Sequence, residues 1–504
     1  MVQTPSTTYS SSSSPSSPSS PSSPSSSSPG GPPPSGAARA RRKRTVPVWA
    51  VLLTACAGQF LVVLDVSVVN TALPSMRSDL GMSAVGLQWV VNAYSIAFAG
   101  FMLLGGRAGD LFGRKRMFLV GLGLFTAASL GGGLAQAEWQ LLVARAVQGL
   151  GAAVLAPSTL TILTSAVPEG AARARAIGVW SAVGAGGGAA GGLVGGVLTD
   201  LLSWRWVLLI NVPVGALVIV AGLAWLTESR ADRTRRLDVP GAVLVTAGLA
   251  TLAYGIVQTE EKGWTAAATL VPLAAGLALL AAFLVVEART KMPLMPLKLF
   301  KVRTVSAANA AMFVCGAGMF AMWMFMTLYT QNVLGYSPLK AGIALMPSSL
   351  TVVIGSMMAP RLMPVIGAKN VSVLGIVVAA AGFGWQSTMT VDGAYVTSIL
   401  LPGMVMMLGA GLATTPLASL ATSGAKADDA GLVSGLVNTS RTMGGALGLA
   451  VLSTVAAAQM HGSSSPQALT DGYAMAFRTS GFILLAGVAV LLVWMPRRRV
   501  PAEG

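Results

Sequence analysis

The sequence predicts an all-α polytopic membrane protein with 14 transmembrane helices, arranged as two six-helix halves with two further helices inserted between them. Three observations support this: the composition, the number of long apolar stretches and the placement of the basic residues. Hydrophobic residues make up 54% of the 504 residues and charged residues only 10%. A soluble globular protein has about 25% charged residues, so the composition excludes that class.

Fourteen mainly apolar stretches follow one another, each close to the 20 residues that an α-helix needs to cross a bilayer. They lie near residues 47–73, 85–106, 116–136, 140–164, 174–198, 205–226, 239–257, 267–286, 305–333, 340–361, 371–390, 397–419, 432–457 and 478–496.

The basic residues alternate between the two sides that this count defines. Of the 33 Lys and Arg, 26 fall on the side of the N-terminus, and two, Arg145 and Arg441, lie inside helices. Cytoplasmic segments of membrane proteins are enriched in Lys and Arg, so we expect a multi-pass cell-membrane protein with both termini in the cytoplasm. The charge follows topology and does not indicate nucleic acid binding. Five basic residues fall on the other side: Arg77, Arg205, Lys262, Lys340 and Arg478.

The chain divides by composition and by a weak internal repeat. Residues 1–45 form a Ser/Pro-rich tail that ends in a basic cluster and is predicted to be disordered and cytoplasmic. The stretch 355–369 repeats the Gly, Arg, Gly and Lys placement of 105–116, which predicts two related halves. We therefore expect a six-helix bundle over 46–228, two inserted helices over 229–290, a second bundle over 291–496 and a cytoplasmic C-terminus over 497–504.

Residue types typical of enzymes and metal sites are scarce. Cys56 and Cys315 lie in apolar stretches, and His461 is the single histidine. This excludes a histidine-based catalytic triad and gives no support for a disulfide framework or a metal site. No nucleophile and base pair or nucleotide-binding loop is apparent. We expect no enzyme activity and no cofactor other than protons.

The stretch GGRAGDLFGRKR, residues 105–116, lies between two predicted spans. Gly105, Gly109 and Gly113 recur every four residues, which places them on one helical face where another backbone can approach closely. Asp110 and Arg114 have the spacing of an ion pair along a helix. A basic cytoplasmic loop explains the cations but not Asp110, which indicates a loop that docks on adjacent helices and separates from them again.

Asp65 is the one acidic residue well inside a predicted span. A carboxylate is costly to ionise in hydrocarbon, so its proton can be exchanged as water access alternates between the two sides. Arg145 lies at a similar depth in the fourth span when 1.5 Å per residue is counted from each side. We expect the two to pair and protonation of Asp65 to release the pair. A permanent structural ion pair is the alternative.

The fifth span contains GAGGGAAGGLVGG, in which Gly184, Gly188, Gly192 and Gly196 form one row and Gly187, Gly191 and Gly195 the next. Glycine costs up to about 1 kcal/mol in a helix interior, so the run needs a reason in packing or bending. A close helix crossing explains it without a function. Arg441, deep in the thirteenth span, is either the counterpart of Arg145 or a ligand of backbone carbonyls.

Four motifs resemble those of the major facilitator superfamily and follow one another along the chain in the order expected for that family. The loop is similar to the family's signature between its second and third helices at Gly106, Asp110, Gly113, Arg114 and Lys115, but has Ala108 and Leu111 where Leu and Arg are usual. The first and fourth spans resemble those of fourteen-helix drug:proton antiporters of the EmrB/QacA type. In the fifth, Gly191, Gly195 and Gly196 match the antiporter motif, and Gly192 replaces its proline. The resemblance links Arg145 to proton coupling.

We therefore predict proton-coupled efflux of amphipathic small molecules such as drugs or antibiotics, by alternating access in a protein that is monomeric in the lipid bilayer. With one membrane carboxylate, neutral or monovalent ligands are favoured. A dedicated exporter of one metabolite is the alternative, and a membrane sensor or enzyme a remote one. The residues expected to line the substrate cavity are Asn70, Gln88, Trp89, Asn92, Tyr94, Gln148, Phe320, Trp323, Asn438 and Arg441.

Overall fold

The fourteen predicted spans are present. The computed structural model describes residues 47–168, 171–229, 237–290, 293–295, 297–422 and 430–495, all within the unit Val46–Gly504. Over these residues the chain forms helices and no strand, and 14 helices are long and apolar enough to cross a membrane. The fold class is confirmed. The predicted tail, 1–45, and C-terminus, 497–504, lie outside the described residues.

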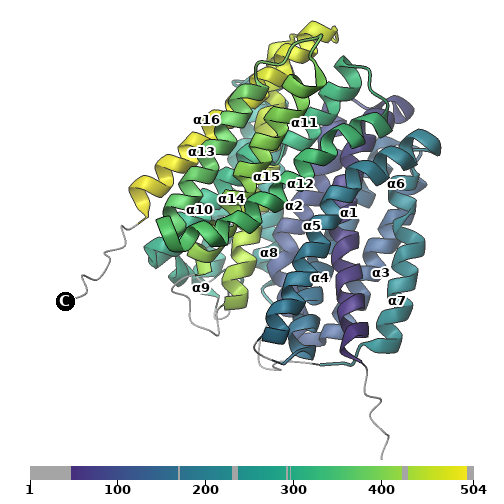
Figure 1. Cartoon of the computed structure of the whole chain (residues 1–504), viewed down its shortest axis with the longest axis vertical. Coiled ribbons are helices and arrows are strands. Elements are labelled where there is room, and N and C mark those ends of the chain that lie inside the picture. The colour runs from purple at the N-terminus through teal and green to yellow at the C-terminus, as the bar shows by residue number, and fades with distance from the viewer. Residues whose placement is uncertain are drawn as a thin grey trace, which may run out of the picture. The chain divides into compact units, whose positions relative to one another are not determined.

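The N-terminal half is built from seven helices that form six spans (Figure 1). The predicted sixth span is interrupted at Ile210, because Pro213 has no N–H to donate to the carbonyl of Leu209. The helices are α1 (Val48–Leu80), α2 (Ala84–Phe112), α3 (Arg114–Gly133), α4 (Glu138–Ala166), α5 (Ala171–Leu201), α6 (Trp206–Leu209) and α7 (Asn211–Trp225).

The C-terminal half also has six spans. Its first is broken after Met319, where Gly316 and Gly318 weaken the last turn. Its last begins at Pro466, so Arg478, predicted in an external loop, lies inside a helix. The elements are η1 (Leu297–Lys301), α10 (Arg303–Met319), α11 (Met322–Leu328), the π-helical turn η2 (Tyr329–Val333), α12 (Pro338–Ile366), α13 (Ala368–Gln386), η3 (Val396–Leu400), α14 (Leu401–Thr422), α15 (Ala430–Met460) and α16 (Pro466–Trp494).

The two halves repeat the same helix packing. In the N-terminal half α2 and α3 both pack on α4, and α1 packs on α5. In the C-terminal half α12 and α13 both pack on α14, and α10 packs on α15. Gly113, between α2 and α3, and Gly367, between α12 and α13, both have positive φ, at 109° and 81°. The repeat inferred from residues 355–369 is therefore present in the backbone.

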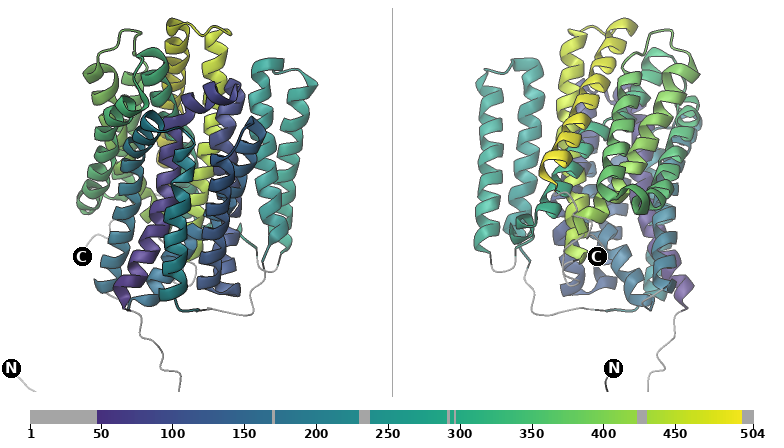
Figure 2. Two further views of the ribbon diagram at one scale, coloured as in Figure 1. Left: turned by 90° about the vertical axis from the view of Figure 1, so that its right-hand side faces the viewer. Right: turned by 60° about the vertical axis from the view of Figure 1, so that its left-hand side comes forward.

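The inserted helices are α8 (Val239–Lys262) and α9 (Ala267–Arg289), a hairpin that lies beside α15 and α2 (Figure 2). Helix α8 packs on α2 of the first half and on α15 of the second. The shared apolar cluster consists of Ile96, Val245, Leu249, Ala253, Val257, Phe283, Ala446 and Ala450. The inserted pair thus contacts both halves. Its predicted boundaries, after residues 228 and 290, stay predictions.

The halves meet closely at one end of the bundle, which we name the Gly81 end after the α1–α2 connection. The opposite end, at the α2–α3 connection, is the Gly113 end. At the Gly81 end Gln331 Nε2 donates to the carbonyl of Thr71 over 2.9 Å. A Cβ on Gly196 of α5 would lie 2.6 Å from the carbonyl oxygen of Pro338 in α12. A side chain at position 196 would therefore clash with α12.

The glycines of α5 contact two different helices, α1 and α12. A Cβ on Gly191 would lie 2.3 Å from Ser67 Cβ, and one on Gly195 2.8 Å from the carbonyl oxygen of Val68, so this row packs on α1. Gly192 and Gly196 instead face α12. In the same helix Gly184 and Gly188 have ordinary contacts of 3.5 and 3.6 Å with α1 side chains. The predicted close helix crossing is present, and it also joins the two halves.

Replacing Gly196 by Ala is expected to shift the protein toward a conformation that is open at the Gly81 end, because the new methyl group cannot fit against α12. Spin labels at Asp200→Cys and Lys340→Cys would measure the separation of α5 and α12 at this end. Gly186→Ala is the matched control, since nothing lies within 4 Å of its Cβ position. An unchanged distance distribution in Gly196→Ala would contradict the role of this contact.

Candidate functional site

Asp65 lies at the centre of a buried polar cluster in the N-terminal half. Its Oδ2 accepts a hydrogen bond from Arg145 Nη1 over 2.6 Å. Its Oδ1 accepts from Gln148 Nε2 at 2.6 Å and from Asn211 Nδ2 at 3.0 Å. The side chains of Asp65 and Arg145 are 0% and 2% exposed. The predicted contact between them is present, and both carboxylate oxygens are occupied.

The cluster joins side chains from five helices. Ser129 Oγ of α3 accepts from Gln148 Nε2 over 2.8 Å and, at 3.4 Å, from Asn211 Nδ2. The guanidinium of Arg145 also donates to Gln148 Oε1 and to the carbonyl of Val90 in α2. A buried ion pair is stable only when its remaining donors and acceptors are also paired, and these partners meet most of that requirement.

Tyr94 of α2 supports the cation from one side. The guanidinium carbon of Arg145 lies 4.4 Å from the centre of the Tyr94 ring, a cation–π distance. The ring itself stacks on Phe98 with centroids 5.9 Å apart. Tyr94 was predicted to line a substrate cavity, but it is 2% exposed and contacts the ion pair instead. Gln148, predicted with it, is likewise part of the cluster and 1% exposed.

Two other cavity candidates are also buried in this conformation. They are Gln88 and Asn92 of α2, and Gln88 Oε1 and both polar atoms of Asn92 have no hydrogen-bond partner among the described residues. Trp89 packs against the apolar cluster shared with α8 and α15. Asn70 donates to the carbonyl of Val66 in its own helix. None of these contacts is with a cavity, so a substrate role for them stays a prediction.

The candidates from the C-terminal half lie near the contact between the halves. Phe320 packs against Gly445 of α15, and Trp323 packs against the main apolar core; both are half-buried. Asn438 of α15 donates to Met102 Sδ of α2 at 3.2 Å and accepts from Arg441 Nη2 at 3.0 Å. The Arg441 side chain is exposed.

The loop at Gly113 docks on the segment that follows α7. Lys115 Nζ donates to the carbonyls of Leu223 and Leu226, over 2.8 and 2.7 Å, at the C-terminal end of α7. This is where a helix dipole favours a cation. In the second half Lys369 Nζ donates in the same way to the carbonyls of Leu492 and Met495 at the end of α16.

The glycines of this loop differ from their predicted arrangement. Gly113 is not on a helical face, because α2 ends at Phe112. The pair Asp110–Arg114 forms at 3.3 Å, but across the break between α2 and α3. Gly105 does allow a close approach, with its Cβ position 2.3 Å from the carbonyl oxygen of Ala153, whereas Gly106 has only an ordinary contact of 3.6 Å.

Glu228 completes the docking, and the sequence analysis missed it. Its carboxylate accepts from the backbone N–H groups of Lys115 and Arg116, both over 3.2 Å, at the N-terminus of α3. These N–H groups have no partner within the helix, and a negative charge there is favoured by the helix dipole. An acid in a connecting segment has no sequence pattern that predicts this contact.

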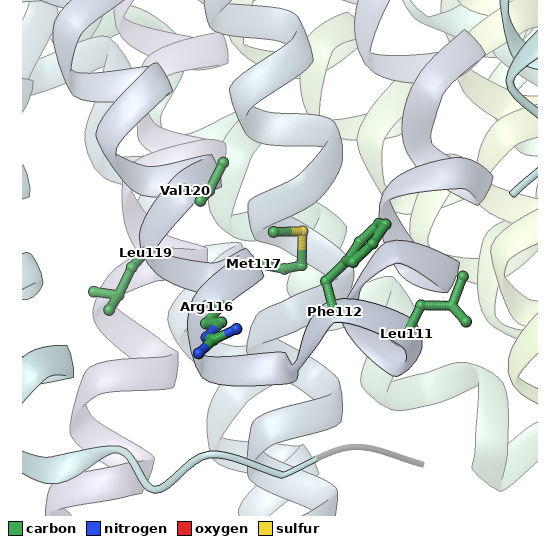
Figure 3. A pocket seen from close by; sticks show the side chains of 6 residues that line it. All are labelled: Leu111, Phe112, Arg116, Met117, Leu119 and Val120. Atoms are coloured by element: carbon green, nitrogen blue, oxygen red, sulfur yellow. The ribbon is translucent and has the colours of Figure 1, made fainter. Parts of the chain in front are cut away.

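An apolar groove lies at the same connection, between the end of α2 and the start of α3, and includes one basic side chain, Arg116 (Figure 3). It is formed by Leu111, Phe112, Arg116, Met117, Leu119 and Val120. None of these side chains belongs to the Asp65 cluster, so this groove is not the site at which a buried carboxylate can act.

Two further polar features escaped the sequence analysis. Ser129 and Asn211 bind the Asp65 cluster, and only the Asn211-Val-Pro break of the sixth span offered a signal. Glu287 of α9 is 2% exposed and accepts from the N–H of Met295, while its Oε1 has no hydrogen-bond partner within the described part of the chain. Among the described residues no group of three potential metal ligands occurs.

The sequence matches the family model of the Major Facilitator Superfamily over residues 55–449. The chain belongs to the major facilitator superfamily. As a member it is 47% identical to a cephamycin export protein of Amycolatopsis lactamdurans, over 92% of this chain and 95% of that protein. It is 38% identical to a puromycin resistance protein of Streptomyces alboniger, over 88% and 91% of the two chains. The family and these relatives are transporters.

Solved structures agree on the fold. An auto-inhibited peptide transporter of the POT family superimposes with a TM-score of 0.67 at 15% sequence identity, covering 90% of this chain and 98% of that one. At this level of identity the likeness supports the major facilitator fold and says nothing of the substrate.

Replacing Arg145 by Gln is expected to lower the free energy of unfolding by about 3–5 kcal/mol at neutral pH, because Asp65 is left as an uncompensated buried charge. Chemical denaturation in detergent measures this loss. The double variant Asp65→Asn, Arg145→Gln should recover most of it.

The matched control is Arg205→Gln. Arg205 pairs with Asp79 over 2.6 Å, but its side chain is 32% exposed, so the loss should be about 0–1 kcal/mol. A double variant as unstable as Arg145→Gln alone would contradict the assignment of the loss to the charge of Asp65.

Proposed function

We propose that this protein exports amphipathic small molecules, antibiotics among them, across the cell membrane in exchange for protons. The observation that supports this most directly is the Asp65 cluster: one fully enclosed carboxylate whose two oxygens are bound by Arg145, Gln148 and Asn211. The name of one related protein states export of cephamycin, and that of another states resistance to puromycin. The cluster adds a group that can accept and release a proton inside the membrane.

The proposed cycle depends on competition between Arg145 and a proton for Asp65. When the carboxylate is ionised, Arg145 binds it and the cluster is closed, as in this structure. When Asp65 is protonated, its attraction to Arg145 is lost, and the side-chain amides of Gln148 and Asn211 no longer donate to an anion. Re-forming the pair expels the proton. Asp65 and Arg145 are therefore the proposed proton-coupling residues, with Gln148 and Asn211 positioning the carboxylate.

The route from this cluster to the contact between the halves is short. Ser67, two residues after Asp65 in α1, donates from Oγ to the carbonyl of Gly188 in α5 over 2.8 Å. Gly191 packs on Ser67 at the same crossing, and one residue further along α5 Gly192 faces α12. A displacement of α1 on protonation would thus move the glycine-rich helix that closes the Gly81 end.

The charge distribution sets the proposed orientation. The Gly113 end carries most of the Lys and Arg, so it is assigned to the cytoplasm together with both termini. The contacts between the halves at the Gly81 end then close the protein toward the outside in this conformation. The loop residues Gly106, Asp110, Gly113, Arg114 and Lys115 are proposed to stabilise one of the two conformations by docking on the end of α7. A monomer without further cofactor is sufficient for this cycle.

A dedicated exporter of one metabolite is the second candidate. The relative with 47% identity is named for a single class of compound, cephamycins, which favours this alternative. Competition for the export of a cephamycin by chemically unrelated amphipathic compounds separates the two. Competition by several unrelated compounds supports broad specificity, and none supports the dedicated exporter.

Asp65→Asn is expected to abolish efflux driven by a pH gradient in proteoliposomes while leaving substrate exchange without a gradient in place, because a permanently neutral residue 65 permits the conformational change but exchanges no proton. Uptake of labelled cephamycin measures both. Asp79→Asn, which alters an acid paired with Arg205 at the Gly81 end, should retain gradient-driven efflux. Full gradient-driven efflux by Asp65→Asn would refute this mechanism.

A further inference from the structure

Arg441 is an exposed cation in the middle of a packed helix. It lies 11 residues after the start of α15, a helix that packs against α2, α8, α10 and α16. A side chain that is surrounded by helices at this depth and is nevertheless exposed faces an internal space. A guanidinium at this depth is costly unless it faces protein or water. The exposure of Arg441 therefore indicates a functional role.

The neighbours of Arg441 identify that space. Asn438, one turn earlier, contacts Met102 of α2, which belongs to the N-terminal half. Gly445, one turn later, packs against the ring of Phe320 at the end of α10. The residues one turn before and one turn after Arg441 therefore contact a methionine of the first half and an aromatic ring of the second. These are adaptable apolar surfaces suited to the body of an amphipathic molecule.

Within the part of the chain that the structure describes, Arg441 has no acidic partner. Its Nη2 donates to Asn438 Oδ1 at 3.0 Å, a neutral acceptor on the same helix. The buried acid of the other half, Asp65, is 0% exposed and already bound by Arg145. Asn438 thus binds one N–H of the guanidinium, and the remaining N–H groups of Arg441 are left for another acceptor.

We propose that Arg441 binds an anionic group of the transported compound, so that the substrates of this protein are amphipathic anions, carboxylates in particular. The planar guanidinium fork matches a carboxylate with two parallel hydrogen bonds. The apolar part of the compound then packs on Met102 and Phe320. This inference rests on the proposed export function and specifies its substrate class.

Charge movement is a second consequence. If n protons enter for each molecule exported, the exchange of a neutral compound moves n charges inward. The exchange of a monovalent anion moves one more, because a negative charge leaves at the same time. The membrane potential therefore drives the export of an anion more strongly than that of its neutral analogue, whatever the value of n.

The experiment compares a cephamycin carrying its free carboxylate with the methyl ester of the same compound, in proteoliposomes that contain the full chain. Arg441→Gln is expected to weaken binding of the acid by about 10- to 100-fold and to leave the ester within about twofold. Arg441→Lys, which keeps the charge but not the fork, should give an intermediate value for the acid. Arg478→Gln, at an exposed arginine of α16, is the matched control and should bind both compounds as the wild type does.

The possible results distinguish failure of the anion site at Arg441 from failure of the proposed export function. If the wild type exports neither compound under an imposed pH gradient, the proposed function fails for this probe. If the wild type exports them but Arg441→Gln weakens acid and ester equally, or neither, the anion site is refuted. Should Arg441→Gln not fold, Arg441→Lys decides in its place: weaker binding of the acid with unchanged binding of the ester supports the site, and equal effects on both compounds overturn it.

Discussion

The fold of the N-terminal half depends on the ion pair between Asp65 and Arg145. Moving two charges out of water costs several kcal/mol each, and the attraction between them compensates only if nearly every other lone pair and N–H of the pair is satisfied. Here that requirement brings Gln148, Ser129 and Asn211 together with the ring of Tyr94, so that with α1 five helices contribute to the cluster. The register of α3, α4 and α7 against α1 is fixed by this requirement as much as by apolar packing.

The same pair links chemistry to conformation. Helix α1 carries Asp65 and, within the next turn, the side chains on which Gly191 and Gly195 of α5 pack. Gly192 and Gly196, in the neighbouring row of α5, face α12 in the second half. Two adjacent faces of one helix therefore contact the helix of the proton-binding residue and the other half of the protein. A side chain larger than hydrogen at Gly191, Gly195 or Gly196 would push these neighbours apart.

The two halves are alike in packing but not in chemistry. Both have a glycine with positive φ and a lysine that binds the end of the last helix of the half, and these belong to the shared fold. The buried acid that pairs with an arginine, Asp65, lies in the first half, and Arg441 lies in the second. Under the proposals made above, one half binds the proton and the other binds the substrate, while the common fold provides the motion.

The features that the sequence could predict are those with a strong, one-dimensional signal. Fourteen apolar stretches and the alternation of basic residues give the spans, and two opposite charges at one depth give the pair Asp65–Arg145. Ser129 and Asn211 could not be found in this way, because small polar residues are common in transmembrane helices and have no periodic pattern. Tyr94 and Gln148 are predicted to line the substrate cavity. A polar residue in a span needs hydrogen-bond partners, but the sequence does not show whether these belong to a substrate or to the protein. The break before Asn211 was predictable only from Pro213.

The complete enclosure of Asp65 has a consequence for when the proton moves. A side chain with 0% exposure and both oxygens bound cannot exchange a proton with water until Arg145 or its neighbours move away. Protonation therefore belongs to a different conformation from the one described here. Because linkage is reciprocal, a conformation that binds the proton more tightly is itself favoured by the proton. If the closed cluster accompanies the cytoplasm-facing conformation, a proton from outside stabilises the opposite one. The proton gradient then drives the cycle in the direction of export.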